Sequence, residues 1–393
     1  MKSDPYIYLD YAATTPVDEQ VAQAMAETLM AGGAFGNPSS NHPIGRESLA
    51  IVETARAQLA DLIGATPRDI IWTSGATESD NMAIAGAARY RAYRGRHLIT
   101  MPVEHKAVTD TFEALAREGF EVTWLSPEAD GMLDLQQFDD AIRDDTQLVS
   151  IMLVNNETGV IQDIERIGGR CRERGILFHV DAAQAVGKIP IDLAKLPVDL
   201  MSLTAHKFYG PKGVGALFVA DRPDCQLEPL LFGGGHERRL RPGTSPVHQI
   251  RGIGLAAEIA ANRMHDDLEH ISALRAHLWS GIGDLPGLTL NGRPDDGFPG
   301  ILNVSAEGVD GESLMLALQP VCVASGSACN AKSGESSYVL RALGRGDHLA
   351  QSAIRFSIGR HSTVDDIVTA IRRYRAAVID LRAMAPIVRG GSA

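Results

Sequence analysis

The stretch Ile176–Gln184, with the sequence Ile-Leu-Phe-His-Val-Asp-Ala-Ala-Gln, decides the fold of this chain. Its first residues, Ile176–Val180, form an apolar run of strand length, and the carboxylate of Asp181 follows directly. Another strand-like run, Leu148–Val154, and the helix-period segment Ile164–Arg174 precede it. The order strand, helix, strand predicts parallel strands joined by right-handed crossovers, with a ligand crevice at the carboxyl ends of the strands.

The same alternation extends through the first two thirds of the chain. Further strand candidates are Asp69–Thr73, His97–Met101, Glu121–Leu125, Leu200–Leu203 and Gly215–Val219, and further helix candidates are Asn81–Tyr93, Val108–Glu118 and Leu135–Ile142. The strands are β-branched and apolar on both faces, as in a sheet that helices cover on both sides. We therefore predict an α/β fold, with a large domain whose mostly parallel sheet is covered by helices.

The pattern changes at the Gly/Pro-rich segment 233–247. A long helix follows from Gln249–Met264 and onward, then a separate helix at Leu274–Ile282, and then short strands with polar turns. We expect a smaller α+β C-terminal domain that the N-terminal segment completes. The predicted division is 16–250 for the large domain, and 1–15 together with 251–393 for the small one.

Composition narrows the class of protein. The chain has 393 residues and a net charge of 37 − 49 = −12, and an acidic surface argues against general nucleic-acid binding. We find no apolar run of membrane-span length and no hydrophobic signal segment, so direct membrane binding is not expected. The four cysteines, Cys171, Cys225, Cys322 and Cys329, form no Cys-x-x-Cys pair. We therefore expect a reducing cytoplasm, no disulfide framework and no metal site.

Three segments at predicted strand ends carry chemical groups. Ser74–Asp80 follows a strand and opens a helix, which suits either a phosphate cradle or a well-capped helix with Asp80 in an approximate capping box. Asp181 needs a cationic partner such as a protonated pyridine nitrogen, a metal or an arginine, unless it only caps the next turn. Lys207, flanked by Thr204 and His206, is either a nucleophilic amine or a surface lysine. Together they are the parts that a pyridoxal 5'-phosphate enzyme requires.

The chain resembles the cysteine desulfurases of the NifS/IscS type, in the class V aminotransferase group of fold type I enzymes. The matching segments are Tyr8–Pro16, Phe35–Ser40, Thr73–Asn81, Glu104–Val108, Val154–Gly159, His179–Gln184, Ser202–Gly213, Gly233–Glu237, Arg241–Thr244, Ser325–Cys329, Ser337–Gly344 and Ile354–Ser357. They cover nearly the whole chain. The resemblance implies conversion of L-cysteine to L-alanine, with transfer of the sulfur as a persulfide to acceptor proteins.

The resemblance also implies a role for each site residue. Lys207 would hold the cofactor covalently, Asp181 would pair with the pyridinium nitrogen, and His105 would stack on the ring and shuttle protons. Gln184 would donate a hydrogen bond to the phenolic oxygen. Asn156 and Arg355 would orient the substrate, Asn156 also contacting the cofactor. The phosphate would be held by Ala76, Thr77, Thr204 and His206, with Thr244 from the second subunit of a homodimer.

Cys329 is the expected sulfur acceptor. Small and polar residues surround it, which suits an exposed loop, whereas Cys322, Cys171 and Cys225 fit buried structural positions. The resemblance leaves room for Cys329 as a transient iron–sulfur ligand. After the cysteine, Asn330, Ala331, Gly334 and Ser336 depart from the pattern Thr-Ser-x-Ser-Leu-Glu-Pro of the housekeeping members. We also expect the extra C-terminal segment with which those members contact an iron–sulfur scaffold to be absent, and both features leave the acceptor open.

Alternative functions stay open from the sequence. A selenocysteine lyase or a class V aminotransferase would use the same fold, although a transaminase needs no reactive cysteine. A catalytically idle binding protein would not need these chemical groups. The acceptor could belong to iron–sulfur cluster assembly, tRNA thiolation or DNA phosphorothioation.

Overall fold

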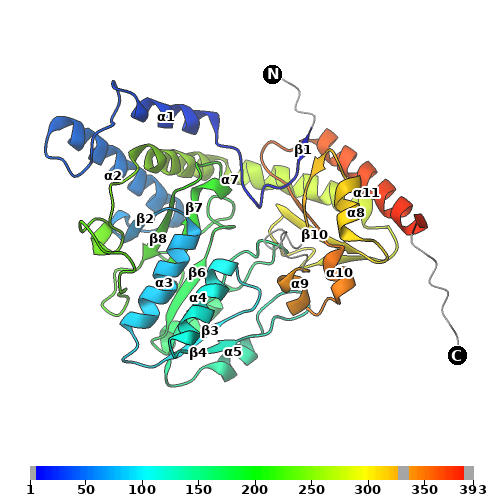
Figure 1. The fold of residues 1–393 in the computed structure, drawn as a ribbon, viewed down its shortest axis with the longest axis horizontal. Helices are drawn as coiled ribbons and strands as arrows, with labels where there is room; N and C mark the ends of the chain where they lie inside the picture. The colour runs from blue at the N-terminus through cyan, green and yellow to red at the C-terminus, as the bar shows by residue number, and fades with distance from the viewer. Residues whose placement is uncertain (1–5, 326–335, 385–393) are drawn as a thin grey trace.

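The computed structural model describes residues 6–325 and 336–384. Figure 1 shows a large sheet with its helices beside a smaller sheet, and the long helix α7 runs between the two parts. The helices are α1 (Glu19–Leu29), α2 (Pro43–Ile63), α3 (Ala76–Tyr90), α4 (Lys106–Arg117), α5 (Leu135–Ala141), α6 (Ile164–Glu173), α7 (Val247–Ile282), α8 (Gly311–Ala317), α9 (Tyr338–Ala342), α10 (Asp347–Gln351) and α11 (Val364–Met384).

The large sheet has seven strands in the order β2-β8-β7-β6-β5-β3-β4. They are β2 (Ile70–Thr73), β3 (His97–Thr100), β4 (Glu121–Trp124), β5 (Thr146–Ser150), β6 (Leu177–Asp181), β7 (Leu200–Thr204) and β8 (Gly215–Val219). In this sheet β8 alone runs opposite to the other strands, so the prediction of a mostly parallel sheet is confirmed.

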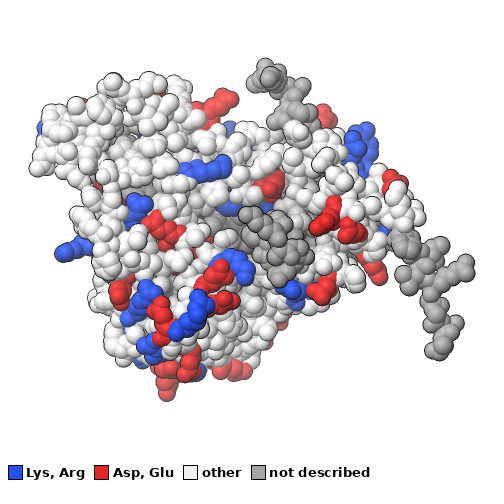
Figure 2. All heavy atoms as spheres, viewed as in Figure 1, with Lys and Arg blue, Asp and Glu red and all other residues white. Residues whose placement is uncertain are grey.

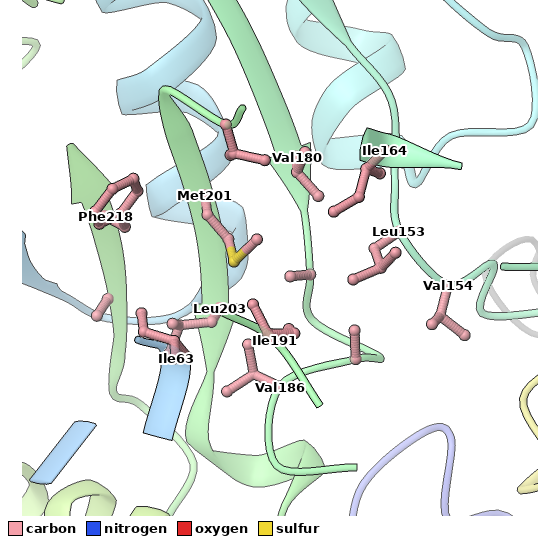
Figure 3. Packing of buried hydrophobic residues seen from close by; sticks show 14 of the residues in the cluster. Ile63, Leu153, Val154, Ile164, Val180, Val186, Ile191, Met201, Leu203 and Phe218 are labelled. Carbon is pink, nitrogen blue, oxygen red and sulfur yellow. The ribbon is translucent and has the colours of Figure 1, made fainter. Parts of the chain in front are cut away.

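Apolar side chains fill both faces of this sheet. On one face Val180, Met201 and Leu203 pack with Ile63 of α2 and Val186 in the largest buried cluster (Figure 3). On the other face α3 and α4 cover the strands with a second cluster. Since both faces are buried, the alternation of apolar and polar residues that marks a half-exposed strand is absent here.

The second sheet has the order β12-β13-β10-β9. Its strands are β9 (Leu288–Asn291), β10 (Ile301–Ala306), β12 (Ala324–Ser325) and β13 (Ile354–Ser357). β1 (Ile7–Tyr8) pairs with β11 (Val321–Cys322), and Leu9 belongs to the core cluster of this part. These contacts favour an N-terminal segment that completes the smaller unit, and the exact division into 16–250 and 1–15 with 251–393 stays a prediction.

Two predicted boundaries are wrong. The helices expected at Gln249–Met264 and Leu274–Ile282 are one helix, α7. Its apolar pattern breaks because its first half packs in the large core up to Ala260 and its second half in the small core from Ile271. The strand expected at Leu148–Val154 leaves the sheet after Ser150, and residues beyond it line the functional cavity.

Within residues 6–325 and 336–384, no helix has both the length and the apolar character needed to cross a bilayer.

Candidate active site

A cavity of about 630 Å³ lies where the carboxyl ends of β6 and β7 meet the N-terminus of α3. Ten of the twelve predicted site residues line it: Ala76, Thr77, His105, Asn156, Asp181, Gln184, Thr204, His206, Lys207 and Arg355. Parallel strands that end at one edge bring these distant segments together, as the topology predicted.

The first turn of α3 forms one wall of the cavity. Gly75 is the N-cap, with φ of +152°, and no side-chain cap bonds the first-turn N–H groups. A side chain at Gly215 of β8 would place its Cβ 2.7 Å from the Gly75 Cα, so Gly215 is required by this close approach and Gly75 by its positive φ. Uncapped N–H groups and the helix dipole favour an anion such as a phosphate here.

The predicted capping box at this helix is wrong. Asp80 does not reach back to the helix start but lies fully buried beneath the cavity. Glu78 makes the local contact instead, since its carboxylate accepts a hydrogen bond from the Ser74 N–H at 2.6 Å and pairs with Arg241 at 3.0 Å. Glu78, on the first turn, thus helps to fix the cradle.

Lys207 lies in a short 3₁₀ turn directly after β7, and its Nζ donates to the carbonyls of Ala12 at 2.5 Å and Ala13 at 2.8 Å. His206 Nδ1 lies 3.1 Å from the Thr14 hydroxyl. Burial, with Lys207 and Lys212 nearby, lowers the pKa of His206 to about 4. His206 is therefore neutral near pH 7 and can offer one N–H to a phosphate oxygen.

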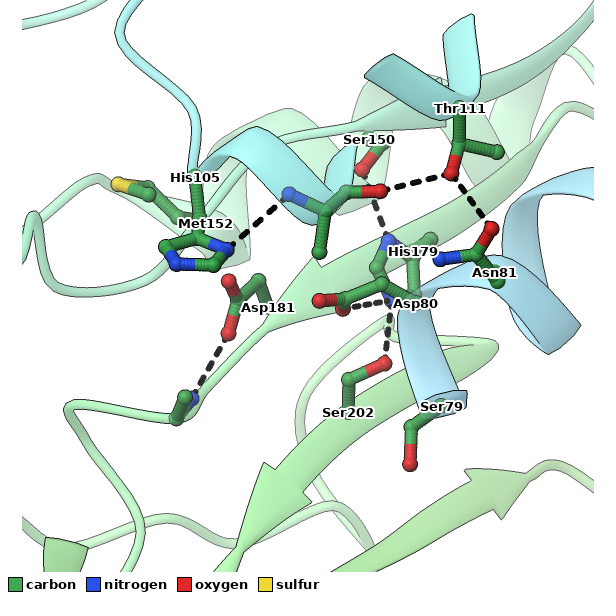
Figure 4. A network of polar contacts seen from close by, with 12 residues as sticks. Ser79, Asp80, Asn81, His105, Thr111, Ser150, Met152, His179, Asp181 and Ser202 are labelled. Carbon is green, nitrogen blue, oxygen red and sulfur yellow. Dashed lines mark hydrogen bonds and ion pairs between the residues drawn. The ribbon is translucent and has the colours of Figure 1, made fainter. Parts of the chain in front are cut away.

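Asp181 and His105 form the floor of the cavity (Figure 4). Asp181 accepts a hydrogen bond from the Ala183 N–H at 2.9 Å and is 5% exposed. Burial raises its pKa, and the neighbouring His105 and Lys207 oppose this effect. A cation in the cavity would stabilise the ionised carboxylate, which is what a pyridinium nitrogen supplies.

His105 is held in one tautomer. It caps α4, and its Nδ1 accepts the Ala107 N–H at 3.1 Å, so Nε2 carries the proton of the neutral ring. Burial lowers the pKa of His105 and keeps the ring neutral. Thr111 extends this contact, since its hydroxyl lies 2.7 Å from the Ala107 carbonyl and 3.0 Å from Asn81 Oδ1 (Figure 4).

Behind Asp181 lies a second layer of buried polar groups. His179 Nδ1 lies 2.8 Å from the Ser150 hydroxyl, and its Nε2 lies 2.9 Å from the Ser202 hydroxyl and 3.6 Å from Asp80 (Figure 4). Burial lowers the pKa of His179 to about 3 and raises that of Asp80 well above its usual range. Burial thus disfavours the charged forms of both His179 and Asp80, and Asp181 is the carboxylate of this group that lines the cavity.

Arg355 and Asn156 have unused polar atoms. The Arg355 guanidinium donates to the Asn156 carbonyl at 2.8 Å and to Asp10 at 2.8 Å, while its Nε is buried without a hydrogen-bond partner among the described residues. The Asn156 Oδ1 is likewise buried and, in this part of the chain, unpaired. An amino-acid ligand, with a carboxylate and an ammonium group, can satisfy both atoms.

Two predicted residues lie outside this group. Thr244 is exposed and lines a separate groove of about 380 Å³ with Leu29 and Phe35. Cys329 falls in 326–335, outside the described residues. Cys171 and Cys225 are fully buried, as predicted, and burial raises the pKa of Cys225 to about 12. Cys322 is half-buried on β11.

The comparisons with known proteins agree with this geometry. The family described as aminotransferase class-V matches residues 7–369. The chain belongs to this family. It is 55% identical over 382 residues to "Cysteine desulfurase IscS" of Cronobacter sakazakii, covering 97% of this chain and 95% of that protein. It is 54% identical, with the same coverage, to the protein of that name from Serratia proteamaculans.

Solved structures of this family have the same fold. A "NifS-like protein" has a TM-score of 0.88 at 36% identity and covers 95% of this chain and all of that one. The structure titled DndA from Streptomyces lividans has a TM-score of 0.76 at 41% identity, covering 89% of this chain and 99% of that one. The resemblance to NifS/IscS-type enzymes is confirmed, and members of the family use pyridoxal phosphate. The donor set of the cavity suits that group.

The sequence reasoning missed several wall residues. Ala12, Ala13 and Thr14 form one side of the cavity, and Lys212 lies on its rim. The run Ala12–Thr15 contains only small side chains, which is the signal that could have indicated a close backbone approach to a ligand. Lys188 also lies close, as its Nζ donates to Gln184.

Proposed function

We propose that this cavity is the active site of a pyridoxal-phosphate-dependent cysteine desulfurase, which converts L-cysteine to L-alanine and leaves the sulfur as a persulfide on Cys329. One observation carries the proposal: a lysine amine, a buried carboxylate and an uncapped helix N-terminus line one cavity. When bound, pyridoxal phosphate supplies an electron sink for the substrate's Cα.

Each residue of the cavity has a proposed role toward the cofactor or the substrate. Lys207 would hold the cofactor covalently, and its amine is the group that would move a proton at the substrate's Cα. Asp181 would stabilise positive charge on the ring nitrogen, and His105 would pack against the ring. Ala76, Thr77, Thr204 and His206 hold the phosphate. Gln184 donates a hydrogen bond from Nε2 to the phenolic oxygen, and Asn156 contacts the cofactor as well as the substrate.

The test of the activity is chemical. The purified protein loaded with pyridoxal phosphate should produce equal amounts of alanine and, with an added thiol, sulfide from L-cysteine. Production of a keto acid instead would favour an aminotransferase. Turnover of selenocysteine with none of cysteine would favour a selenocysteine lyase.

Arg355 and Asn156 orient the substrate, and Arg355→Lys tests the first contact. Lysine keeps the charge but loses the buried Nε–H and the planar pair of donors, so we expect the KM for cysteine to rise about tenfold or more with a smaller loss of kcat. The holoenzyme's visible absorption should not change. Arg166→Lys, at an arginine that is 63% exposed on α6, is the control. An unchanged KM in Arg355→Lys would contradict the assignment.

We propose that the protein acts as a homodimer, with Thr244 completing the phosphate site of the partner subunit. Large apolar side chains stand exposed next to the Thr244 groove, including Leu29 at 61%, Met30 at 62% and Phe35 at 57%. Figure 2 shows few charged groups on the visible face of this part, over α1 and the start of α2. A second copy of the chain would bury this surface.

Mixed dimers test Thr244 in trans. A chain with Lys207→Ala combined with a chain with Thr244→Val should restore one intact site in each mixed dimer, because the intact Lys207 and the intact Thr244 then meet across the interface. Each parental homodimer should bind the cofactor poorly or turn over slowly. If mixing restores no activity above the sum of the two parents, Thr244 does not act across the interface.

We further propose that the enzyme works in the cytoplasm and passes its sulfur to an acceptor protein. The acceptor class would be found by incubating the persulfidated enzyme with candidate carriers and following transfer of labelled sulfur by mass spectrometry.

A further inference from the structure

Lys188 stands behind the cavity in a continuous line of hydrogen bonds. Its Nζ donates to Gln184 Oε1 at 2.7 Å, and Gln184 Nε2 donates to the Ala12 carbonyl at 2.8 Å. The same carbonyl accepts from Lys207 Nζ at 2.5 Å. Gln184 and Lys207 thus donate to one backbone oxygen at the wall of the cavity, and Lys188 donates to the other end of the Gln184 amide.

The local backbone sets this arrangement. After β6 the chain forms a helical turn in which the N–H groups of Lys188 and Ile189 both donate to the Ala185 carbonyl. Gly187 has φ of +74°, and a Cβ there would lie 2.7 Å from the Phe208 Cβ. The turn therefore packs closely, and it carries residue 188 one turn beyond residue 184, on the same side.

A lysine at this position is costly for the fold. It borders a small, mostly apolar cavity of about 30 Å³, and its Nζ lies 5.5 Å from the centre of the Phe298 ring. Burial, with the positive charges of Lys207 and Arg355 nearby, holds the pKa of Lys188 well below its ordinary value. Within the described part of the chain, the partners of its Nζ are the Gln184 amide and the Phe298 ring. Packing alone would favour a methionine of similar length.

The hydrogen bonds explain what the lysine contributes. A backbone carbonyl only accepts, so the Gln184 atom facing Ala12 must be the NH₂ group and the atom facing Lys188 must be the oxygen. Lys188 keeps N–H donors whether its amine is charged or neutral. Without it, the Gln184 oxygen would be a buried acceptor lacking its donor, and the amide would be free to turn.

We propose that Lys188 is a positioning residue that fixes the Gln184 amide with its NH₂ group toward Ala12 and the cofactor cavity. The inference rests on the proposed role of Gln184 toward the cofactor's phenolic oxygen. A fixed N–H donor next to that oxygen stabilises negative charge on it. With the cofactor bound, this donor would lower the pH at which the visible absorption of the holoenzyme changes.

Lys188→Met tests the proposal with two measurements that do not use turnover. We expect the apoenzyme to bind pyridoxal phosphate about tenfold more weakly, the order expected when one buried acceptor loses its donor. The pH midpoint of the holoenzyme's visible absorption should shift upward. Lys188→Gln, which keeps an uncharged donor, should shift it less. Lys195→Met, at a lysine that is 83% exposed, is the control and should change neither quantity.

The Gln184→Ala background separates the possible failures. There, Lys188→Met should have no further effect, because the amide it orients is gone. If Gln184→Ala itself leaves both measurements unchanged, the proposed role of Gln184 is wrong. If Gln184→Ala changes them and Lys188→Met does not, the inference about Lys188 is wrong. A Lys188→Met apoenzyme that fails to fold also counts against it, since the cost of the buried amine predicts that methionine is tolerated.

Discussion

Lys207→Ala should abolish the borohydride-reducible link to pyridoxal phosphate and lower desulfurase turnover by about 10³-fold or more, since it removes both a covalent partner and a proton-transferring amine. The amine lies in a short turn at the end of β7, where two carbonyls hold it at the edge of the cavity. The amine of Lys188, which lies close to the cavity, is engaged with Gln184.

The measurement combines absorption spectroscopy with a turnover assay. The variant should still bind the cofactor, because the phosphate cradle at Ala76 and Thr77 is intact, but the bound cofactor should be released by dialysis after borohydride treatment. Lys195→Ala, on the surface beside Asp192, serves as the control and should keep both the link and turnover. Turnover near that of the unaltered enzyme in Lys207→Ala would refute the assignment of Lys207.

The fold was predictable because its signals are local. β6 and β7 are buried on both faces, so their runs of apolar residues stand out in the sequence, and Asp181 marks where the first of them ends. The helix α7 was harder to predict. Its middle section lies between two cores and carries polar residues, so a pattern based on one buried face divides it in two.

The site was predictable only in part, for a physical reason. Residues at strand ends meet because the topology forces them together, and these could be deduced in advance. Ala12 and Lys188 could not, since their place depends on long-range packing of the N-terminal segment against the turn after β6. The capping role predicted for Asp80 is wrong because a carboxylate near a helix start usually caps it, whereas here Asp80 is fully buried beside His179.

The identity of the sulfur acceptor depends on which thiol can ionise. A thiolate is needed to attack the sulfur of cysteine. Burial raises the pKa of Cys225 to about 12, so this thiol stays protonated near pH 7. Burial raises the pKa of Cys171 as well. Cys322 lies in β11, paired with Tyr8 of β1, and does not line the cavity.

Formation of the persulfide on Cys329 also requires that a thiol lose its proton, and His105 is the histidine on the floor of the cavity. The neutral ring carries its proton on Nε2, and its Nδ1 already accepts the Ala107 N–H. In this arrangement Nε2 of His105 can donate its proton to a group in the cavity. His105 can accept a proton only if the hydrogen bond from the Ala107 N–H to Nδ1 is broken. We therefore expect the rate of persulfide formation to rise with pH as the substrate thiol or Cys329 ionises by itself.

Cys329→Ser should bind pyridoxal phosphate and L-cysteine with unchanged affinity and yet accumulate no persulfide. In the step, the Cys329 thiolate forms a bond to the substrate sulfur while the C–S bond breaks. The electron pair of the broken bond stays on the substrate carbon, which gains a proton and becomes the methyl group of alanine, and the sulfur is oxidised to the persulfide level. A serine hydroxyl cannot take this role, because it is far less acidic than a thiol and oxygen forms no stable equivalent of the product.

Cys322→Ser is the matched control and should change turnover little. Mass spectrometry of peptides after a single turnover decides the matter: the added mass of one sulfur atom is expected on the Cys329 peptide, and the same mass found on Cys322, Cys171 or Cys225 alone would move the acceptor to that residue.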